Sequence, residues 1–137
     1  MGVEAGRRHI ERFRAPEAIR AELTDLITRA GGLVWSRRGL APAQRSLTTI
    51  GVLVATGKLG PLREHIEIGL VNGLGQQEIS EAILHCSVYA GFPAMVAAME
   101  VAADVFDGER GSASRTKTAR GAASGTTRRP RARRPRS

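Results

Sequence analysis

The fold is indicated most clearly by residues 42–57, which read PAQRSLTTIGVLVATG. Leu47, Ile50 and Val54 recur at the three- and four-residue spacing of an α-helix and do not alternate as strand residues do. The leading proline suits the first helical turn, where its missing N–H would be unpaired in any case. The closing glycine suits the position after a helix, where a left-handed conformation is needed. The stretch therefore predicts one helix.

The same pattern repeats outward along the chain in both directions. Prolines stand ahead of apolar-periodic stretches at positions 16, 42, 61 and 93, and glycines stand behind them at 31, 57, 73, 91 and 108. Each stretch has helical spacing, and the connections between stretches are short. We therefore predict a compact all-α domain of five to six helices, at roughly 16–30, 42–56, 61–72, 76–90 and 93–107, with a further short helix at 3–14.

The apolar content is aliphatic, because aromatic residues make up only 4% of the chain. Two of the predicted helical stretches, 46–56 and 93–99, contain no charged residue. A helix that is apolar nearly all round must be buried on several sides. In a domain this small, we expect these helices to pack against another subunit as well, which predicts a homo-oligomer.

Charge divides the chain into two parts. Ten of the 21 basic residues lie in 110–137, where there is no acidic residue, which leaves 11 basic against 13 acidic residues before that point. After Gly111 the chain consists of small, basic and polar residues that cannot bury enough apolar surface to offset the entropy of ordering. We predict a folded domain at 1–108 and an unstructured Arg-rich tail at 109–137.

Several broad classes of protein do not fit this chain. Cys86 is the only cysteine, so no intrachain disulfide can form and a reducing compartment is compatible. No apolar run follows the arginines near the N-terminus, as a secretory signal requires, and none is long enough to span a bilayer. We therefore expect a soluble, cytoplasmic protein.

Two familiar site patterns are also excluded. Residues 51–58 hold five residues between their glycines where a phosphate-binding loop needs four, and Leu59 occupies the position of the required hydroxyl. The three histidines, His9, His65 and His85, lack the close spacing of metal ligands. We expect neither a metal ion nor an organic cofactor.

An anion site is one interpretation of the loop WSRRGL at residues 35–40. Arg37 and Arg38 lie in the loop, and Arg45 follows in the next helix. Guanidinium groups beside a helix N-terminus can hold carboxylates, and Trp35 would form an apolar wall. From residue types alone, a solvated basic loop with Trp35 covering the core edge is the favoured interpretation.

His65 flanks the apolar stripe of its helix and could act as a general acid or base, although a boundary histidine with a structural hydrogen bond is the more common case. Glu81, His85 and Tyr89 share one helix face, which suits proton transfer but more often marks a stabilising surface group. Cys86 lies on an apolar stripe with no base predicted beside it, so we expect an inert buried thiol.

Residues 30–106 resemble the carboxymuconolactone decarboxylase family over nearly their whole length. The matching stretches are Val34-Trp35-Ser36-Arg37, Gly39-Leu40, Arg45-Ser46-Leu47-Thr48, His65 with Asn72-Gly73, Glu78-Ile79 with Glu81, and Tyr89-Ala90-Gly91-Phe92-Pro93-Ala94. Several short motifs in the same order and at the same spacing are specific. The resemblance implies an all-α, alkylhydroperoxidase D-like fold in a symmetric homo-oligomer, a trimer or a hexamer.

The resemblance also implies a reaction in aromatic catabolism through β-ketoadipate. The family's name-giving enzyme converts 4-carboxymuconolactone, a dicarboxylate lactone, to β-ketoadipate enol-lactone and carbon dioxide without a cofactor. On the matched positions, Arg37 and Arg45 would bind the substrate's anionic groups and Trp35 would form an apolar wall. His65 would be the catalytic acid, and Tyr89 is a second candidate for that role.

The chain departs from the family pattern at Gly31, Arg38, Pro61 and Glu67, so a divergent member that acts on another small acid is an alternative. In the dithiol branch of the family, two cysteines precede the histidine. Lys58 and Pro61 occupy those positions here, which excludes a dithiol peroxidase cycle. A further alternative is an oligomeric scaffold whose basic tail binds nucleic acid or an acidic partner, although a merely solubilising tail is the simpler interpretation.

Overall fold

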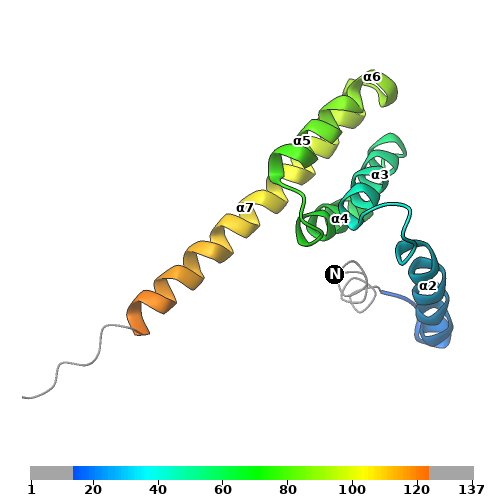
Figure 1. The fold of residues 1–137 in the computed structure, drawn as a ribbon, viewed down its shortest axis with the longest axis horizontal. Coiled ribbons are helices and arrows are strands. Elements are labelled where there is room, and N and C mark those ends of the chain that lie inside the picture. The colour runs from blue at the N-terminus through cyan, green and yellow to red at the C-terminus, as the bar shows by residue number, and fades with distance from the viewer. Residues whose placement is uncertain (1–13, 124–137) are drawn as a thin grey trace, which may run out of the picture. The chain divides into compact units, whose positions relative to one another are not determined.

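The structure is a computed structural model that describes residues 14–123, with side chains described for 14–111. The described residues form a short 3-10 helix followed by α-helices, which Figure 1 labels, and no strand occurs among them. The elements are η1 Glu17–Ile19, α2 Arg20–Trp35, α3 Pro42–Ala55, α4 Leu59–Val71, α5 Gln76–His85, α6 Ser87–Ala90 and α7 Phe92–Ala123. The predicted all-α class is therefore confirmed. The short helix predicted at 3–14 lies outside the described residues, apart from its last position.

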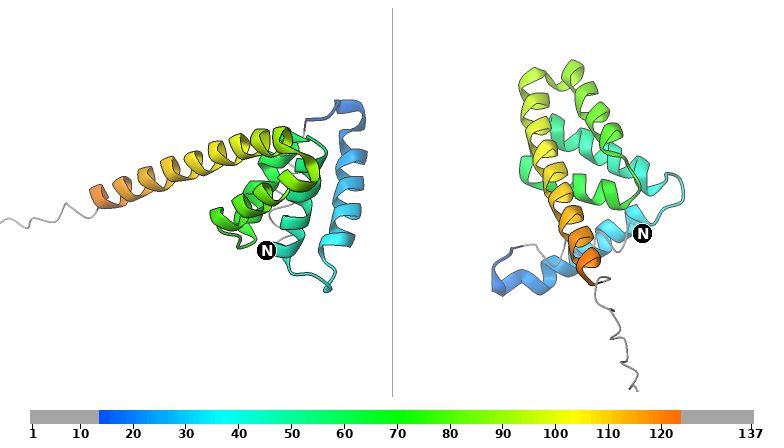
Figure 2. Two further views of the ribbon diagram at one scale, coloured as in Figure 1. Left: turned by 90° about the horizontal axis from the view of Figure 1, so that it is seen from above. Right: turned by 90° about the vertical axis from the view of Figure 1, so that its left-hand side faces the viewer.

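The core lies where α3, α4, α5 and the first half of α7 meet. Its fully buried side chains come from three helices, and two alanines of α7 close the cluster; the members are Ile50, Val54, Leu62, Ile66, Ile79, Ile83, Ala98 and Ala102. Figure 2 shows α5 and α7 side by side, joined through α6. The small side chains of α7 let these helices approach closely. Helical spacing therefore identified the parts of this core that come from α3, α4 and α5, but not Ala98 and Ala102 of α7.

Three of the five glycines predicted to end helices do so. Gly57, Gly73 and Gly91 have φ values of 65°, 97° and 91°, in the region that side chains with a Cβ rarely adopt. Two predictions were wrong, because Gly31 lies inside α2 and Gly108 inside α7. A glycine inside a helix costs only about 1 kcal/mol relative to alanine, so it does not by itself end one.

Other helix boundaries in the structure also differ from those predicted. The first long helix continues past Gly31 to Trp35, and the predicted helix at 76–90 is divided at Cys86 into α5 and α6. There the Cys86 N–H contacts the carbonyl oxygens of both Ala82 and Ile83, at 3.3 and 3.1 Å, because the last turn tightens from α to 3-10 geometry.

The largest difference concerns α7, which continues to Ala123 although an unstructured chain was predicted from residue 109. Residues 109–123 contain Ala, Arg, Lys and Glu, which favour helix, and the next proline comes only at position 130. The chain divides into two units, Met1–Phe106 and Asp107–Ser137, close to the predicted boundary. The predicted tail beyond residue 123 lies outside the described residues. Among the helices described, none has the length and apolar content to cross a membrane.

Side-chain hydrogen bonds fix the beginnings of α3 and α5. The Ala41 N–H donates to Gln44 Oε1 at 2.9 Å where α3 begins, and the Gly75 N–H donates to Glu78 Oε2 at 2.7 Å where α5 begins. Each bond satisfies an N–H that has no partner within its helix. The first bond fixes the start of α3, which carries Arg45 in its first turn.

Candidate active site where α2, α3 and α4 meet

Two aromatic rings from different helices face each other at this junction. Trp35 is the last residue of α2, and His65 lies in the middle of α4. Their ring centroids are 6.3 Å apart, and the ring planes are inclined by 17°. Both residues are half-buried. The indole thus gives the imidazole an apolar neighbour, at a separation typical of interacting aromatic pairs.

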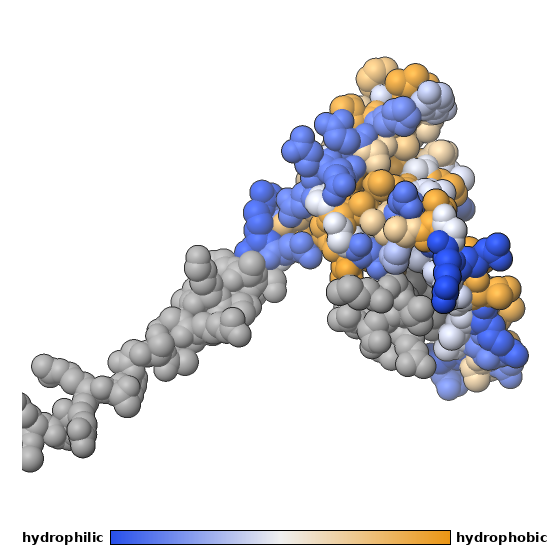
Figure 3. Space-filling view, viewed as in Figure 1, coloured by the Kyte–Doolittle hydropathy of each residue, from blue (hydrophilic) through white to orange (hydrophobic). Residues whose placement is uncertain are grey.

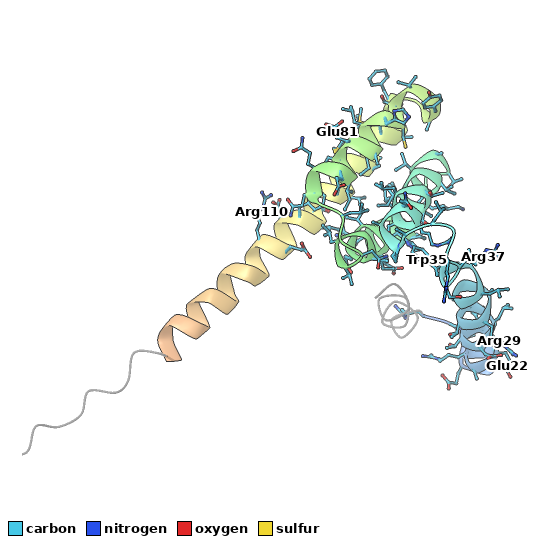
Figure 4. The ribbon with its side chains drawn as sticks, in the orientation of Figure 1. Glu22, Arg29, Trp35, Arg37, Glu81 and Arg110 are labelled. Atoms are coloured by element: carbon cyan, nitrogen blue, oxygen red, sulfur yellow. The ribbon has the colours of Figure 1, made fainter. Side chains whose placement is uncertain are left out.

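Arg45 connects the start of α3 to the loop that follows α2. Its Nη2 donates to the Arg37 carbonyl oxygen at 2.8 Å, across eight residues of sequence. Figure 4 shows Trp35 and Arg37 together where α2 passes into this loop. The hydrogen bond therefore holds the backbone beside Trp35, while the exposed side chain of Arg37 is available for other contacts.

The guanidinium of Arg45 has further donors to offer. Its Nε is buried and donates to no acceptor among the described side chains and backbone. A guanidinium carries five N–H donors in a fixed plane, and a buried donor without an acceptor costs free energy. An anion, such as a carboxylate, would satisfy this group, so Arg45 has the chemistry of an anion-binding residue.

A buried polar pair lies next to Arg45 and was not given a role from the sequence. Ser46 is fully buried, and its Oγ accepts a hydrogen bond of 3.0 Å from Asn72 Nδ2. Asn72 Oδ1 is buried and accepts no hydrogen bond within the described part of the chain. The pair ties the first turn of α3 to the end of α4. A serine on the apolar stripe of a helix was the signal available in the sequence.

Tyr89 does not join this group. It lies on α6 with 80% of its surface exposed, and its ring contacts His85 at a centroid distance of 5.2 Å and an inclination of 49°. No hydrogen bond or ion pair joins Glu81 to His85 among the described side chains. The structure thus pairs Trp35 with His65 and joins Arg45 to the backbone of Arg37, two residues after Trp35, whereas the ring of Tyr89 contacts His85.

Cys86 behaves as an ordinary thiol in a partly apolar setting. It is half-buried, and its Sγ donates to the Ala82 carbonyl oxygen at 3.2 Å. Burial raises the pKa of the Cys86 thiol, which lowers the fraction of reactive thiolate. Among the described residues, no three His, Cys, Asp or Glu side chains gather as they would to hold a metal ion.

Comparison with known proteins identifies a family that matches this chain. The model of the carboxymuconolactone decarboxylase family matches residues 21–104. The chain is 52% identical over 77 residues to 4-carboxymuconolactone decarboxylase of Acinetobacter baylyi, which is 56% of this chain and 58% of that protein. It is 42% identical over 78 residues to nitrosuccinic acid decarboxylase of Metarhizium robertsii, which is 56% of this chain and 54% of that protein.

A third relative is an uncharacterized 15.0 kDa protein of Paracoccus denitrificans. It is 34% identical over 84 residues, which is 60% of this chain and 63% of that protein. The chain therefore spans between half and two thirds of the length of each curated relative it matches. The matched region contains all four residues that meet at the junction of α2, α3 and α4.

Proposed function

The chain belongs to the carboxymuconolactone decarboxylase family, and from that premise we propose that it is a cofactor-independent carboxy-lyase. We propose 4-carboxymuconolactone, or a related small lactone acid, as the substrate and β-ketoadipate enol-lactone as the product. The reaction would take place beside the Trp35–His65 pair. The observation that carries the proposal is this pair, because it sets a proton carrier against an apolar ring, and Arg45 binds the backbone two residues after that ring.

The proposed substrate class follows from what the named relatives act on. One relative is named for 4-carboxymuconolactone and the other for nitrosuccinic acid. Loss of carbon dioxide leaves an electron pair that must be delocalised, and each of these acids carries its own acceptor, an unsaturated lactone in one and a nitro group in the other. A protein that acts on such an acid needs no electron sink of its own.

The reaction on 4-carboxymuconolactone balances without a further reactant. The bond between the ring carbon and the departing carboxylate breaks, and its electron pair passes into the unsaturated lactone to form a dienolate. Carbon dioxide leaves. A proton is then added to carbon, which gives the enol-lactone. The protein must therefore hold the anionic substrate, stabilise the developing enolate oxygen and deliver one proton.

The residues at the junction suit these three tasks. Arg45 would bind a carboxylate or the enolate oxygen through the donors that the Arg37 carbonyl does not use. Arg37 would attract the second carboxylate from its exposed position. His65 would give the proton, since an imidazole titrates near neutral pH. Tyr89 is the weaker candidate for this role, because it is 80% exposed on α6.

The direct test is turnover of 4-carboxymuconolactone by the purified full-length chain, with substrate loss and enol-lactone formation followed separately. We expect a rate well above that of the spontaneous reaction. Nitrosuccinic acid, assayed in parallel, would show which acceptor group the site takes. Failure of the folded protein to accelerate either reaction would overturn the proposal.

A second candidate function has one specific observation in its favour. Ten basic residues and no acidic residue lie in 110–137, which suits electrostatic binding to nucleic acid or an acidic partner. Truncation after residue 109 should leave turnover unchanged and abolish retention on DNA at low salt. If the full-length chain is not retained at low salt, this second function is excluded.

A further inference from the structure

Charge is divided unequally between the two units of the chain. Residues 1–106 carry 11 basic and 11 acidic residues, since Asp107 and Glu109 are the last two of the 13 acidic residues. The unit Asp107–Ser137 therefore carries the whole formal net charge of +8. A strong excess of positive charge in one part of a chain attracts polyanions to that part.

Helix α7 continues into this second unit. We call its residues from Asp107 to Ala123 the α7 extension. The extension contains no apolar residue larger than alanine, so the burial of an apolar face cannot be what stabilises it. Figure 3 shows hydrophilic residues around α7 where its described side chains end, near Arg110, which Figure 4 labels. What the extension offers to a partner is therefore charge.

Three of the basic residues share one side of the extension. Arg110, Lys117 and Arg120 are separated by seven and three residues, which at about 100° per residue places their positions within an arc of about 80°. We call this side the basic face. Arg115 falls on the other side, at about 140° from Arg110. The ion pair between Arg110 and Asp107 weakens the charge at the start of the basic face, so Lys117 and Arg120 carry most of it.

We propose, on the basis of the second candidate function, that the α7 extension binds in the major groove of double-stranded DNA, with the basic face toward the phosphates. The major groove of B-form DNA is about 12 Å wide and admits an α-helix. Between its charges, the basic face holds only alanine and serine, so the helix is slim enough to approach the DNA backbone. Contacts to phosphates carry no sequence information, so we expect little preference among DNA sequences.

The residue types of the second unit favour duplex DNA over other acidic partners. Protein interfaces depend on aromatic and apolar anchors, and single-stranded nucleic acids stack their bases on aromatic rings. Phe106 is the last aromatic residue of the chain, so residues 107–137 offer no such ring. Double-stranded RNA has a major groove that is too deep and narrow even for side chains to read. B-form DNA is therefore the polyanion that suits a basic helix without aromatic residues.

Helical structure and DNA binding should support each other in the α7 extension. Lys117 and Arg120 are three residues apart, so they are neighbours on the helix, where like charges repel. Phosphates against the basic face neutralise both charges. The extension needs no new nucleus, because it is continuous with the preceding turns of α7. We therefore expect duplex DNA to increase the helix content of the chain, and loss of the helix to weaken binding even when every charge is kept.

Two matched charge substitutions test whether one face of the helix meets the DNA. Lys117→Gln removes a charge from the basic face, and Arg115→Gln removes a charge from the other side, two positions earlier. At about 0.05 M salt, the loss of one phosphate contact lowers the affinity for a DNA duplex by about tenfold. We expect this loss for Lys117→Gln and a loss below about threefold for Arg115→Gln, measured by fluorescence anisotropy of a labelled duplex. Equal losses would overturn the proposal.

Thr116 allows a test in which the charge does not change. Thr116→Pro interrupts the helix ahead of Lys117, whereas Thr116→Ala strengthens it, and both variants keep every basic residue. We expect Thr116→Pro to weaken DNA binding by about tenfold and Thr116→Ala to bind at least as tightly as wild type. In circular dichroism, duplex DNA should raise the helix signal of wild type and of Thr116→Ala more than that of Thr116→Pro.

The choice of polyanion separates failure of this proposal from failure of the second candidate function. The full-length chain is assayed with a DNA duplex of about 20 base pairs, an RNA duplex of the same sequence and polyglutamate. We expect the DNA duplex to bind at least about tenfold more tightly than the other two. If all three bind alike, or if Thr116→Pro binds DNA as wild type does, charge alone accounts for binding, and only the proposal is overturned. If the chain binds no DNA at low salt, both are overturned.

Discussion

Helices α2 and α4 each provide one ring of the Trp35–His65 pair, but they are held in the structure by different means. α4 has four buried residues, Leu62, Ile66, Ile68 and Gly69, whereas α2 has none. His65 is therefore positioned by the core, and Trp35 by a helix outside it. The comparison teaches that half of the candidate site forms whenever the domain folds, while the other half depends on what holds α2.

The largest expected effect concerns the side of the site that the core positions. His65→Asn should lower kcat for 4-carboxymuconolactone by about 10²- to 10⁴-fold, because proton delivery by a positioned group contributes a factor of this size. His85→Asn is the matched control, since His85 is exposed on α5 beside Tyr89 and should change kcat less than twofold. Steady-state kinetics would measure kcat for both variants. Equal losses, or no loss, would remove His65 as the acid.

The second prediction separates the two helices by stability. Ile66 is fully buried, so Ile66→Ala should lower the free energy of unfolding by about 2–5 kcal/mol. Leu26→Ala should cost less than about 0.5 kcal/mol in dilute protein, as surface substitutions do. Urea denaturation at several protein concentrations measures both.

If Leu26→Ala lowers the free energy of unfolding strongly in dilute protein, the contrast between α2 and α4 is contradicted. It would mean that a single chain holds α2 through contacts of its own. The first two predictions are independent. The first concerns proton transfer at His65, and the second concerns only the packing of α2.

The sequence predicted the core more fully than it predicted the ends of the helices. Spacing identified the buried faces of α3, α4 and α5, because burial of one face is what imposes that spacing. Gly31 and Gly108 were misread as helix ends. A glycine ends a helix only where the chain also adopts a positive φ, as it does at Gly73, and composition does not show which glycine does so.

Residue chemistry already marked Trp35, Arg37, Arg45 and His65 as candidates, although it favoured ordinary loop and boundary roles for them. Likeness to a family is what made them the candidate site. Arg45 alone resembled an ordinary basic side chain near a loop. What distinguishes it is the bond to the Arg37 carbonyl and the buried Nε, and both depend on how α3 meets the end of α2. The buried Ser46–Asn72 pair joins residues 26 positions apart, and although a serine on an apolar stripe marks a buried polar group, a single sequence does not show which residue it contacts.

The third prediction concerns Arg45, which links the two halves of the site. Arg45→Gln removes a proposed anion-binding group and the hydrogen bond to the Arg37 carbonyl. We expect kcat/KM to fall by about 10- to 100-fold, the range for loss of a hydrogen bond to a charged group. Trp35 emission should shift as well, because the loop beside it is released. A fall in kcat/KM without any shift would assign Arg45 to substrate binding alone.

The smallest expected effect is that of Arg37→Gln, on the α2 side of the site. The hydrogen bond from Arg45 reaches the backbone carbonyl of Arg37, so the substitution leaves that bond in place. The exposed side chain contributes only long-range attraction for a dianionic substrate, which salt screens. We expect KM to rise about two- to fivefold at low ionic strength and to equal that of wild type at about 0.5 M salt, with kcat unchanged. KM measured across a salt series tests this. A loss that persists at high salt would show that the Arg37 side chain binds the substrate directly.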